Sequence, residues 1–272
     1  MAEKSLRFSL GIHAAKTLSA LQDKVKRYED SGFDALHLPD HLGAPAPFPV
    51  LTAIASATSR VRLGTYVPNA GFYKPALLAR DAGEVDQLSG GRLDLGLGAG
   101  YVREEFEAAE LPYPTAGQRV DHLEHTTTYL KKHLPKVPIL IAGNGNRLLT
   151  IAAQHADIIG LTGAGYGDAA DPLAARVEFV RNAAGDRFAD LELNLAITAV
   201  PSGDSEQPDL ALTRRFMDLS DEELMALPSV LSGSPRGIAD TLLGYHEKYG
   251  LTSFTFQENH VDTIAKVIAE LR

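Results

Sequence analysis

An aspartate and a histidine stand side by side at Asp40 and His41, directly after a short apolar run. That position predicts the end of a buried strand. An aspartate can accept hydrogen bonds from the polar edge of a ligand, and a histidine can gain or lose a proton near neutral pH. Either residue alone could simply cap or fill a loop. As an adjacent pair, they predict a site for binding or proton transfer.

Alternating glycines at Gly96, Gly98 and Gly100 form the second candidate feature. A turn of small residues, 89–91, leads into an apolar strand, and the glycines occupy its carboxyl end. Glycine weakens the interior of a strand, so three of them in alternation need a physical reason. A common reason is a bulky ligand that lies directly against the backbone. The segment therefore predicts contact with a flat ligand.

The segment Gly143-Asn144-Gly145-Asn146 could form an anion site, because it opens a predicted helix whose N–H groups could hold a phosphate. Arg147 would add positive charge there, although a solvated arginine explains it equally well. An ordinary tight turn is the alternative, since Asn and Gly tolerate positive φ. The segment 233–237 follows the same logic, but Ser234 capping a helix is the simpler interpretation.

Composition excludes several classes of function. The chain has 272 residues, no cysteine and a formal charge of −9. Disulfides, thiol nucleophiles and zinc–thiolate sites are therefore excluded, and a broad nucleic-acid surface is disfavoured. No His and carboxylate cluster has metal-binding spacing, so no metal is expected. No apolar run reaches membrane-spanning length and no signal core is present, so we expect a cytoplasmic protein without membrane contact.

The elements that must position these residues alternate regularly between strand and helix. Strands are predicted at 8–12, 35–38, 61–67, 92–97, 137–142, 157–161, 192–200 and 253–256. Helices are predicted at 18–30, 49–57, 75–88, 118–132, 148–155, 172–183, 235–249 and 261–271. Eight such units favour a single (β/α)8 barrel domain over residues 1–272. A polar stretch at 201–208 predicts a short insertion before the last βα unit.

In such a barrel the ligand site lies at the carboxyl ends of the strands. Asp40, His41 and the glycines 143 and 145 all follow predicted strands and would meet at that face. Arg92 begins a strand, so we expect it at the opposite, structural face. Glu104 and Glu105 suit the start of a helix, where carboxylates complement the helix dipole. The histidines at 122, 125 and 133 are expected on helix surfaces.

The motifs together resemble the bacterial luciferase-like monooxygenase superfamily, and within it the oxidoreductases that use the deazaflavin coenzyme F420. The segments that carry the resemblance are 32–35, 40–41, 63–67, 74–79, 89–100, 139–145 and 156–157. The Ser-Gly-Gly-Arg-x-x-x-Gly-x-Gly-x-Gly run is the most specific of them. The resemblance implies a luciferase-like barrel, often a homodimer, that binds coenzyme F420 or flavin mononucleotide (FMN).

The resemblance also implies roles for individual residues. Asp40 and His41 match the pair beside the cofactor ring, with His41 as proton donor or acceptor. Tyr66 and Val67 match a site where many members carry a cis peptide bond behind the ring. The remaining matches are cofactor contacts: Asn69, the backbone at Ala99 and Gly100, and the phosphate-side residues Gly143, Asn144, Gly145, Asn146 and Thr162.

The chain also departs from the family pattern. Tyr101 stands where the sugar-phosphate dehydrogenases carry a catalytic glutamate, so we expect it to be a second polar group over the ring. Leu42-Gly43-Ala44 replaces an aromatic residue after Asp-His, and Gly165 replaces a lysine. These departures disfavour a sugar-phosphate substrate, and we expect hydride transfer between F420 and a small organic substrate. An FMN-dependent monooxygenase and a cofactor-binding protein without turnover are the alternatives.

Overall fold

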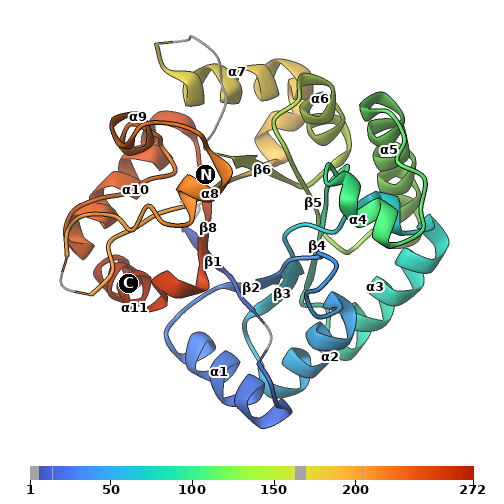
Figure 1. Ribbon diagram of the computed structural model, residues 1–272, viewed down its shortest axis with the longest axis horizontal. Helices are drawn as coiled ribbons and strands as arrows, with labels where there is room; N and C mark the ends of the chain where they lie inside the picture. Colours follow the sequence, from blue (N-terminus) through green and yellow to red (C-terminus); the bar gives the residue numbers. More distant parts are fainter. Residues whose placement is uncertain (1–5, 14, 163–169, 204) are drawn as a thin grey trace.

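Eight parallel strands close into a barrel that is surrounded by helices (Figure 1). The computed structural model describes residues 6–13, 15–162, 170–203 and 205–272. Each strand pairs with the next one along the chain, and β1 closes the barrel by pairing with β8. The predicted (β/α)8 barrel is therefore confirmed.

The observed bounds differ from the predicted ones by a few residues. The strands are β1 Arg7–Gly11, β2 Ala35–Leu38, β3 Arg62–Thr65, β4 Leu93–Leu97, β5 Ile139–Ala142, β6 Ile158–Thr162, β7 Glu192–Ala196 and β8 Ser253–Gln257. The longer helices are α1 Leu18–Asp30, α2 Pro47–Ala57, α3 Pro75–Ser89, α5 Ala116–His133, α6 Asn146–His155, α7 Pro172–Ala184, α10 Pro235–Tyr249 and α11 Val261–Leu271.

Two short helices were not predicted: α8 Thr213–Phe216 and α9 Asp221–Met225. A third, α4 Arg103–Ala108, was predicted only as a helix start at Glu104 and Glu105. Helix α9 did carry a sequence signal, because Ser220 and Glu223 form a capping box at its start. Helices α8 and α9 lie between β7 and α10, so the inserted segment extends well beyond the polar stretch at 201–208. In Figure 1, α4 and α8 lie inside the ring of outer helices, α4 near β4 and β5 and α8 near β8.

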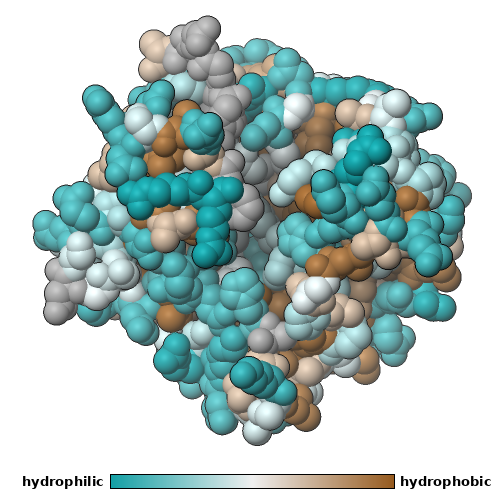
Figure 2. Space-filling view, in the orientation of Figure 1, coloured by the Kyte–Doolittle hydropathy of each residue, from teal (hydrophilic) through white to brown (hydrophobic). Residues whose placement is uncertain are grey.

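The apolar core lies between the strands and the surrounding helices. Fully buried side chains alternate along the strands, among them Leu36, Leu63, Leu95, Ile141 and Phe254. These alternate residues pack outward, because successive side chains of a strand point to opposite faces. Among the described residues no helix is long and apolar enough to span a membrane. The face shown in Figure 2 is mainly hydrophilic, with apolar groups between the hydrophilic ones.

The interior of the barrel, in contrast, is polar at the amino-terminal ends of the strands. Asp94 is buried, and its two carboxylate oxygens accept hydrogen bonds from Arg7 and Arg62, each at 2.8 Å. Arg7 also pairs with Glu192 at 2.8 Å. These residues come from β1, β3, β4 and β7, so their charges meet across the barrel. A buried carboxylate is tolerated here because two guanidinium groups neutralise it.

Nearer the barrel mouth, His37 and Tyr66 stack on each other with ring centroids 5.6 Å apart and an interplanar angle of 6°. Gly64 provides the room for the imidazole, since a Cβ there would lie 2.6 Å from the His37 Cδ2. The Tyr66 hydroxyl donates to Asn194 at 3.0 Å, and Asn194 donates to Ser253 at 2.9 Å. The two rings form a fixed floor beneath the mouth.

Arg92 belongs to the scaffold, as predicted. Its guanidinium donates to the carbonyl oxygens of Ala55, Thr58 and Val61 at 2.9, 3.1 and 2.8 Å. These carbonyls lie at the end of α2 and in the turn that follows it. Arg92 therefore ties α2 to the start of β4, and it takes no part in the ligand site.

Candidate active site

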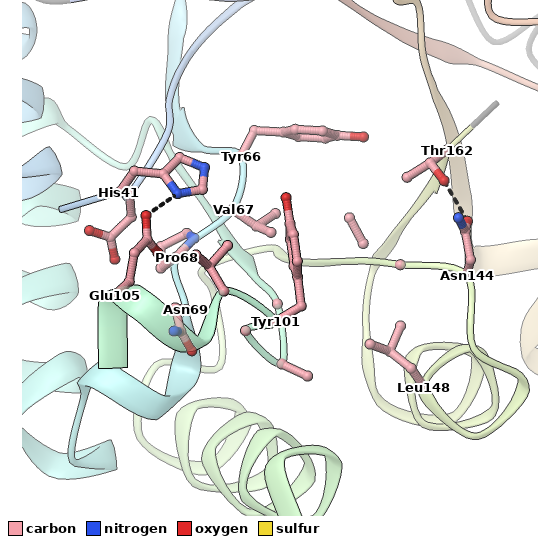
Figure 3. Close-up of a pocket in the computed structure, with 17 residues that line it drawn as sticks. His41, Tyr66, Val67, Pro68, Asn69, Tyr101, Glu105, Asn144, Leu148 and Thr162 are labelled. Carbon is pink, nitrogen blue, oxygen red and sulfur yellow. Dashed lines mark hydrogen bonds and ion pairs between the residues drawn. The ribbon is translucent and has the colours of Figure 1, made fainter. Parts of the chain in front are cut away.

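A cavity of about 420 Å³ opens at the carboxyl ends of the strands (Figure 3). The predicted site residues that line it are Asp40, His41, Tyr66, Val67, Asn69, Ala99, Gly100, Tyr101, Gly143, Asn144 and Thr162. Gly145 and Asn146 do not line the cavity; they follow Asn144 at the start of α6. Gly165 lies outside the described residues. Thus the structure brings together residues that are up to 122 positions apart, from Asp40 to Thr162.

His41 does not stand alone, because its Nδ1 lies 2.7 Å from Oε1 of Glu105. The prediction that Glu105 only complements the start of a helix was therefore incomplete. Glu105 does lie in the first turn of α4, but that turn lies beside the loop after β2 and aims the carboxylate at His41. The sequence offered no signal for this pair, which spans 64 positions.

The Glu105 carboxylate fixes which nitrogen of His41 carries the proton. An ionised carboxylate can only accept, so Nδ1 donates and Nε2 is left as the acceptor. Figure 3 shows the second ring nitrogen turned away from Glu105, on the side of Tyr66. An imidazole held in this way can take a proton at Nε2, and the carboxylate stabilises the charge that results. The pair is equipped for general acid–base catalysis.

Replacing Glu105 with glutamine is expected to remove this control of the tautomer. The amide can donate as well as accept, and it carries no charge to stabilise an imidazolium. The ¹⁵N chemical shifts of the His41 ring should report a protonated Nδ1 in the wild type and a mixture in E105Q. Turnover should fall by roughly 10-fold or more.

The matched control is E104Q, which removes the neighbouring carboxylate from the same helical turn. The Glu104 carboxylate has no hydrogen-bond partner among the described residues. E104Q should therefore keep the wild-type ¹⁵N pattern. A wild-type pattern in E105Q, or an equal change in both variants, would show that Glu105 does not position His41.

Asp40 is more buried than His41 and is held by a different partner. Its Oδ2 accepts from the Tyr73 hydroxyl at 2.9 Å. Burial raises the pKa of the Asp40 carboxyl, and the negative charge of Glu105 raises it further, whereas the bond from Tyr73 acts in the opposite direction. Tyr73 is a site residue that the sequence did not reveal. It makes Asp40 an oriented acceptor beside His41.

The Tyr66–Val67 peptide bond is cis, as the family resemblance implied. Val67 lies on the cavity wall next to the glycine run, and its methyl groups pack where a Cβ at Gly96 or Gly98 would stand. Packing within the protein therefore explains the absence of side chains at Gly96 and Gly98, without a ligand. A Cβ at Gly96 would lie 2.0 Å from the Thr65 carbonyl oxygen. The close approach of the chain at 65–69 requires glycine at 96 and 98.

Asn69 and Tyr101 differ in the burial and in the contacts of their side chains. The Asn69 side-chain oxygen accepts from the backbone N–H of Gly71 at 2.9 Å, and the residue is 6% exposed. Tyr101 is 73% exposed, and Figure 3 shows its ring standing upright in the cavity. Asn69 therefore shapes the wall, whereas Tyr101 is available to a bound molecule.

The far end of the cavity is formed by β5, β6 and the start of α6. The Thr162 hydroxyl donates to Oδ1 of Asn144 at 2.5 Å. Within the described part of the chain no side chain caps α6, whose N-cap residue is Gly145. Arg176 on α7 donates to Oδ1 of Asn146 at 2.6 Å, and Arg147 pairs with Asp121. Asp121 neutralises Arg147, so the N–H groups of this helix start and the Arg176 guanidinium are what make this end suitable for an anion.

Two other residues that the sequence singled out have structural roles. His122 is not a free surface residue, because its Nε2 lies 3.0 Å from the Ala70 carbonyl oxygen and 3.2 Å from that of Tyr73. Ser234 caps α10 by accepting from Gly237, and Arg236 pairs with Asp240, so this segment is a helix cap as predicted. Among the described residues no group of His, Asp and Glu side chains is arranged to hold a metal ion.

Comparison with known proteins agrees with the fold and the motifs. The family model described as luciferase-like monooxygenase matches residues 5–223. The chain is 41% identical over 156 residues to a 5,10-methylenetetrahydromethanopterin reductase of Archaeoglobus fulgidus, covering 50% of this chain and 47% of that protein. It is 32% identical over 169 residues to an F420-dependent glucose-6-phosphate dehydrogenase of Intrasporangium calvum, covering 57% and 49%. The chain thus spans about half the length of the curated relatives it matches.

A solved structure extends the similarity in fold to almost the whole chain. The coenzyme F420-dependent tetrahydromethanopterin reductase of Methanopyrus kandleri superposes with a TM-score of 0.80, covering 98% of this chain and 100% of that one. The two sequences are 16% identical, so this match concerns the barrel alone.

Proposed function

The chain belongs to the luciferase-like monooxygenase family and is an oxidoreductase of that family, and from this premise we propose that it uses coenzyme F420 to oxidise or reduce a small organic substrate. The observation that carries the proposal is the His41–Glu105 pair on the wall of the 420 Å³ cavity. An F420-dependent reaction transfers a hydride and a proton separately, so the protein must supply a group that handles the proton. His41 is placed and oriented for that task.

The residues present fit a cofactor with a flat ring and an anionic tail. Val67, Ala99, Ala142 and Leu148 give the cavity an apolar wall along which a ring could lie. The start of α6, with Gly145 as its N-cap residue, would face the phosphate. Asp40 would accept a hydrogen bond from the polar edge of the ring.

When bound, the deazaflavin supplies hydride chemistry at its ring carbon C5, and the protein supplies position and proton transfer. Oxidation of an alcohol by hydride transfer to that ring would also release the proton of the O–H bond, and the protein must take up this proton. His41 Nε2 takes that proton, and Glu105 stabilises the imidazolium. Tyr101 offers a hydroxyl that can hydrogen-bond the substrate oxygen. In the reverse direction His41 returns the proton.

An FMN-dependent monooxygenase is the second candidate, since the family includes monooxygenases. The two cofactors differ in their tails, because FMN ends at one phosphate and F420 continues beyond it. Arg176 of α7 reaches Asn146 at the start of α6, where a longer anionic tail would leave the cavity. This supports F420.

The experiment is to titrate the purified protein with F420 and with FMN, following absorbance and fluorescence. We expect F420 to bind at least 10-fold more tightly. Replacement of Arg176 with glutamine should weaken F420 several-fold more than FMN. R181Q is the matched control on the same helix, because Arg181 stacks on Phe188 with its guanidinium carbon 4.0 Å from the ring centroid.

Tighter binding of FMN would favour the monooxygenase, and failure to bind either cofactor would overturn the proposal. Binding of F420 without turnover of any alcohol or carbonyl compound would indicate a cofactor-binding protein. The homodimer, the single domain and the cytoplasmic location stay predictions that no feature of this chain tests.

A further inference from the structure

A second cavity, of about 670 Å³, lies beside the first and shares His41 and Tyr66 with it. Its other walls come from the carboxyl ends of β1 and β8 and from 209–215, the inserted segment before and within α8. A molecule in this cavity would therefore reach the imidazole that the first cavity also uses. The two cavities therefore meet at His41, the residue that we propose transfers the proton.

Arg215 lies on this wall, and its guanidinium has no ion-pair partner among the described residues. It lines the second cavity, and among those residues its guanidinium has no hydrogen bond, ion pair or ring contact. The adjacent Arg214 is different, because its guanidinium holds the Asp221 carboxylate at 2.9 Å. Consecutive arginines of one short helix thus serve different purposes: Arg214 joins α8 to α9, and Arg215 is left facing the cavity.

The acidic residues of the same cavity do not neutralise Arg215. Glu258 is already engaged by Lys24 at 2.6 Å and by the Tyr28 hydroxyl at 2.9 Å. Asp209 accepts from the backbone N–H of Ala211 at 3.0 Å, and in the described part of the chain it forms no ion pair with Arg215. The Arg215 guanidinium therefore remains for a ligand.

A buried polar atom in the same wall also lacks a partner. His37 lines the second cavity and is 3% exposed, and its Nδ1 has no hydrogen-bond partner among the described residues. Burial lowers the pKa of His37 to about 4, so the ring is neutral at pH 7 and can make one hydrogen bond through Nδ1. The neutral imidazole therefore adds no charge to this wall, and the guanidinium of Arg215 remains a cationic group that lines it.

We propose that the second cavity is the substrate compartment and that it takes a small organic monocarboxylate whose carboxylate binds Arg215. This deepens the proposed function and rests on it, because the reacting end of the molecule would lie at His41. The planar guanidinium matches a carboxylate in a bidentate arrangement. Asp209 disfavours a second negative charge, so a phosphate monoester fits less well than a carboxylate.

The test measures binding rather than turnover, by calorimetry on the whole protein with and without F420. The probes are benzoate, butyrate, their primary amides, and phenyl phosphate. We expect each carboxylate to bind about 10-fold more tightly than its amide, which corresponds to about 1.4 kcal/mol. Phenyl phosphate should bind more weakly than benzoate.

Two variants separate Arg215 from general charge effects. R215Q should remove the preference for carboxylate over amide, and R214Q should retain it, although both lose one positive charge from the same helix. Equal binding of carboxylates and amides to the wild type, no binding of any probe, or equal effects of R215Q and R214Q would overturn the proposal.

The cofactor titration on the same samples distinguishes a failure of the proposed carboxylate site from a failure of the proposed F420-dependent function. If F420 binds and the carboxylate preference is absent, the substrate class is wrong and the proposed function stands. If neither cofactor binds and the Arg215-dependent preference remains, the carboxylate site stands and its assignment to an oxidoreductase substrate fails.

Discussion

H41A is expected to lower the turnover number by about 100-fold or more, while the affinity for F420 changes by less than about 3-fold. The reason lies in the geometry of the site. Both cavities share the His41 imidazole, and Glu105 holds its Nδ1 at 2.7 Å so that Nε2 is free to exchange a proton. Alanine removes the proton acceptor but leaves the apolar wall and the start of α6 intact.

The measurement follows deazaflavin absorbance during single-turnover and steady-state reactions, with an alcohol or carbonyl compound that the wild type converts. F420 affinity is measured separately by titration. Y101F is the matched control, because it removes a hydroxyl from the same cavity without removing the proton acceptor. We expect a much smaller loss for Y101F. Wild-type turnover in H41A, or a larger loss in Y101F, would assign the proton transfer to another group.

G96A is expected to reduce the free energy of unfolding by roughly 3 kcal/mol or more, the largest effect on stability that we predict. A methyl group at this position would lie 2.0 Å from the Thr65 carbonyl oxygen and 3.0 Å from Cγ1 of Val67. The first of these neighbours is backbone on the adjacent strand, so the clash cannot be relieved by rotating a side chain. The strands β3 and β4 would have to separate next to Val67 and Gly98, which line the cavity.

The comparison variant is G244A, a glycine in the exposed middle of α10 with no atom within 4 Å of its added methyl group among the described residues. Alanine there should increase the free energy of unfolding by about 0.5–1 kcal/mol, because alanine favours the helix. Urea denaturation of both variants and the wild type checks the pair. If G96A were as stable as the wild type, the close approach at Thr65 would not constrain residue 96.

The barrel was predictable because its signal is local and repeated. Each apolar strand is followed by an amphipathic helix, and eight such units leave few alternatives. Once the barrel is assumed, the residues after each strand must meet at one face. That is why Asp40, His41 and Thr162 could be assigned to one site although they are distant in the sequence.

Glu105 shows what the same reasoning could not reach. Two acidic residues near the start of a helix satisfy the helix dipole, and this local explanation accounts for Glu104 completely. The path of the chain after β4, which brings the start of α4 beside the loop that follows β2, decides that Glu105 faces His41. Arg214 and Arg215 differ for a similar reason, since only the packing of α8 against α9 pairs the first with Asp221.

The glycines at 96, 98 and 100 separate the two kinds of information most clearly. The sequence by itself determined that side chains are excluded there and that the segment ends a strand at the ligand face, because glycine is otherwise unfavourable in a strand. Only the tertiary structure decided what excludes those side chains. The neighbouring chain at Thr65, Val67 and Asn69 occupies the space. A one-dimensional pattern records that a residue must be small, whereas the identity of its neighbour depends on contacts between strands that only folding creates.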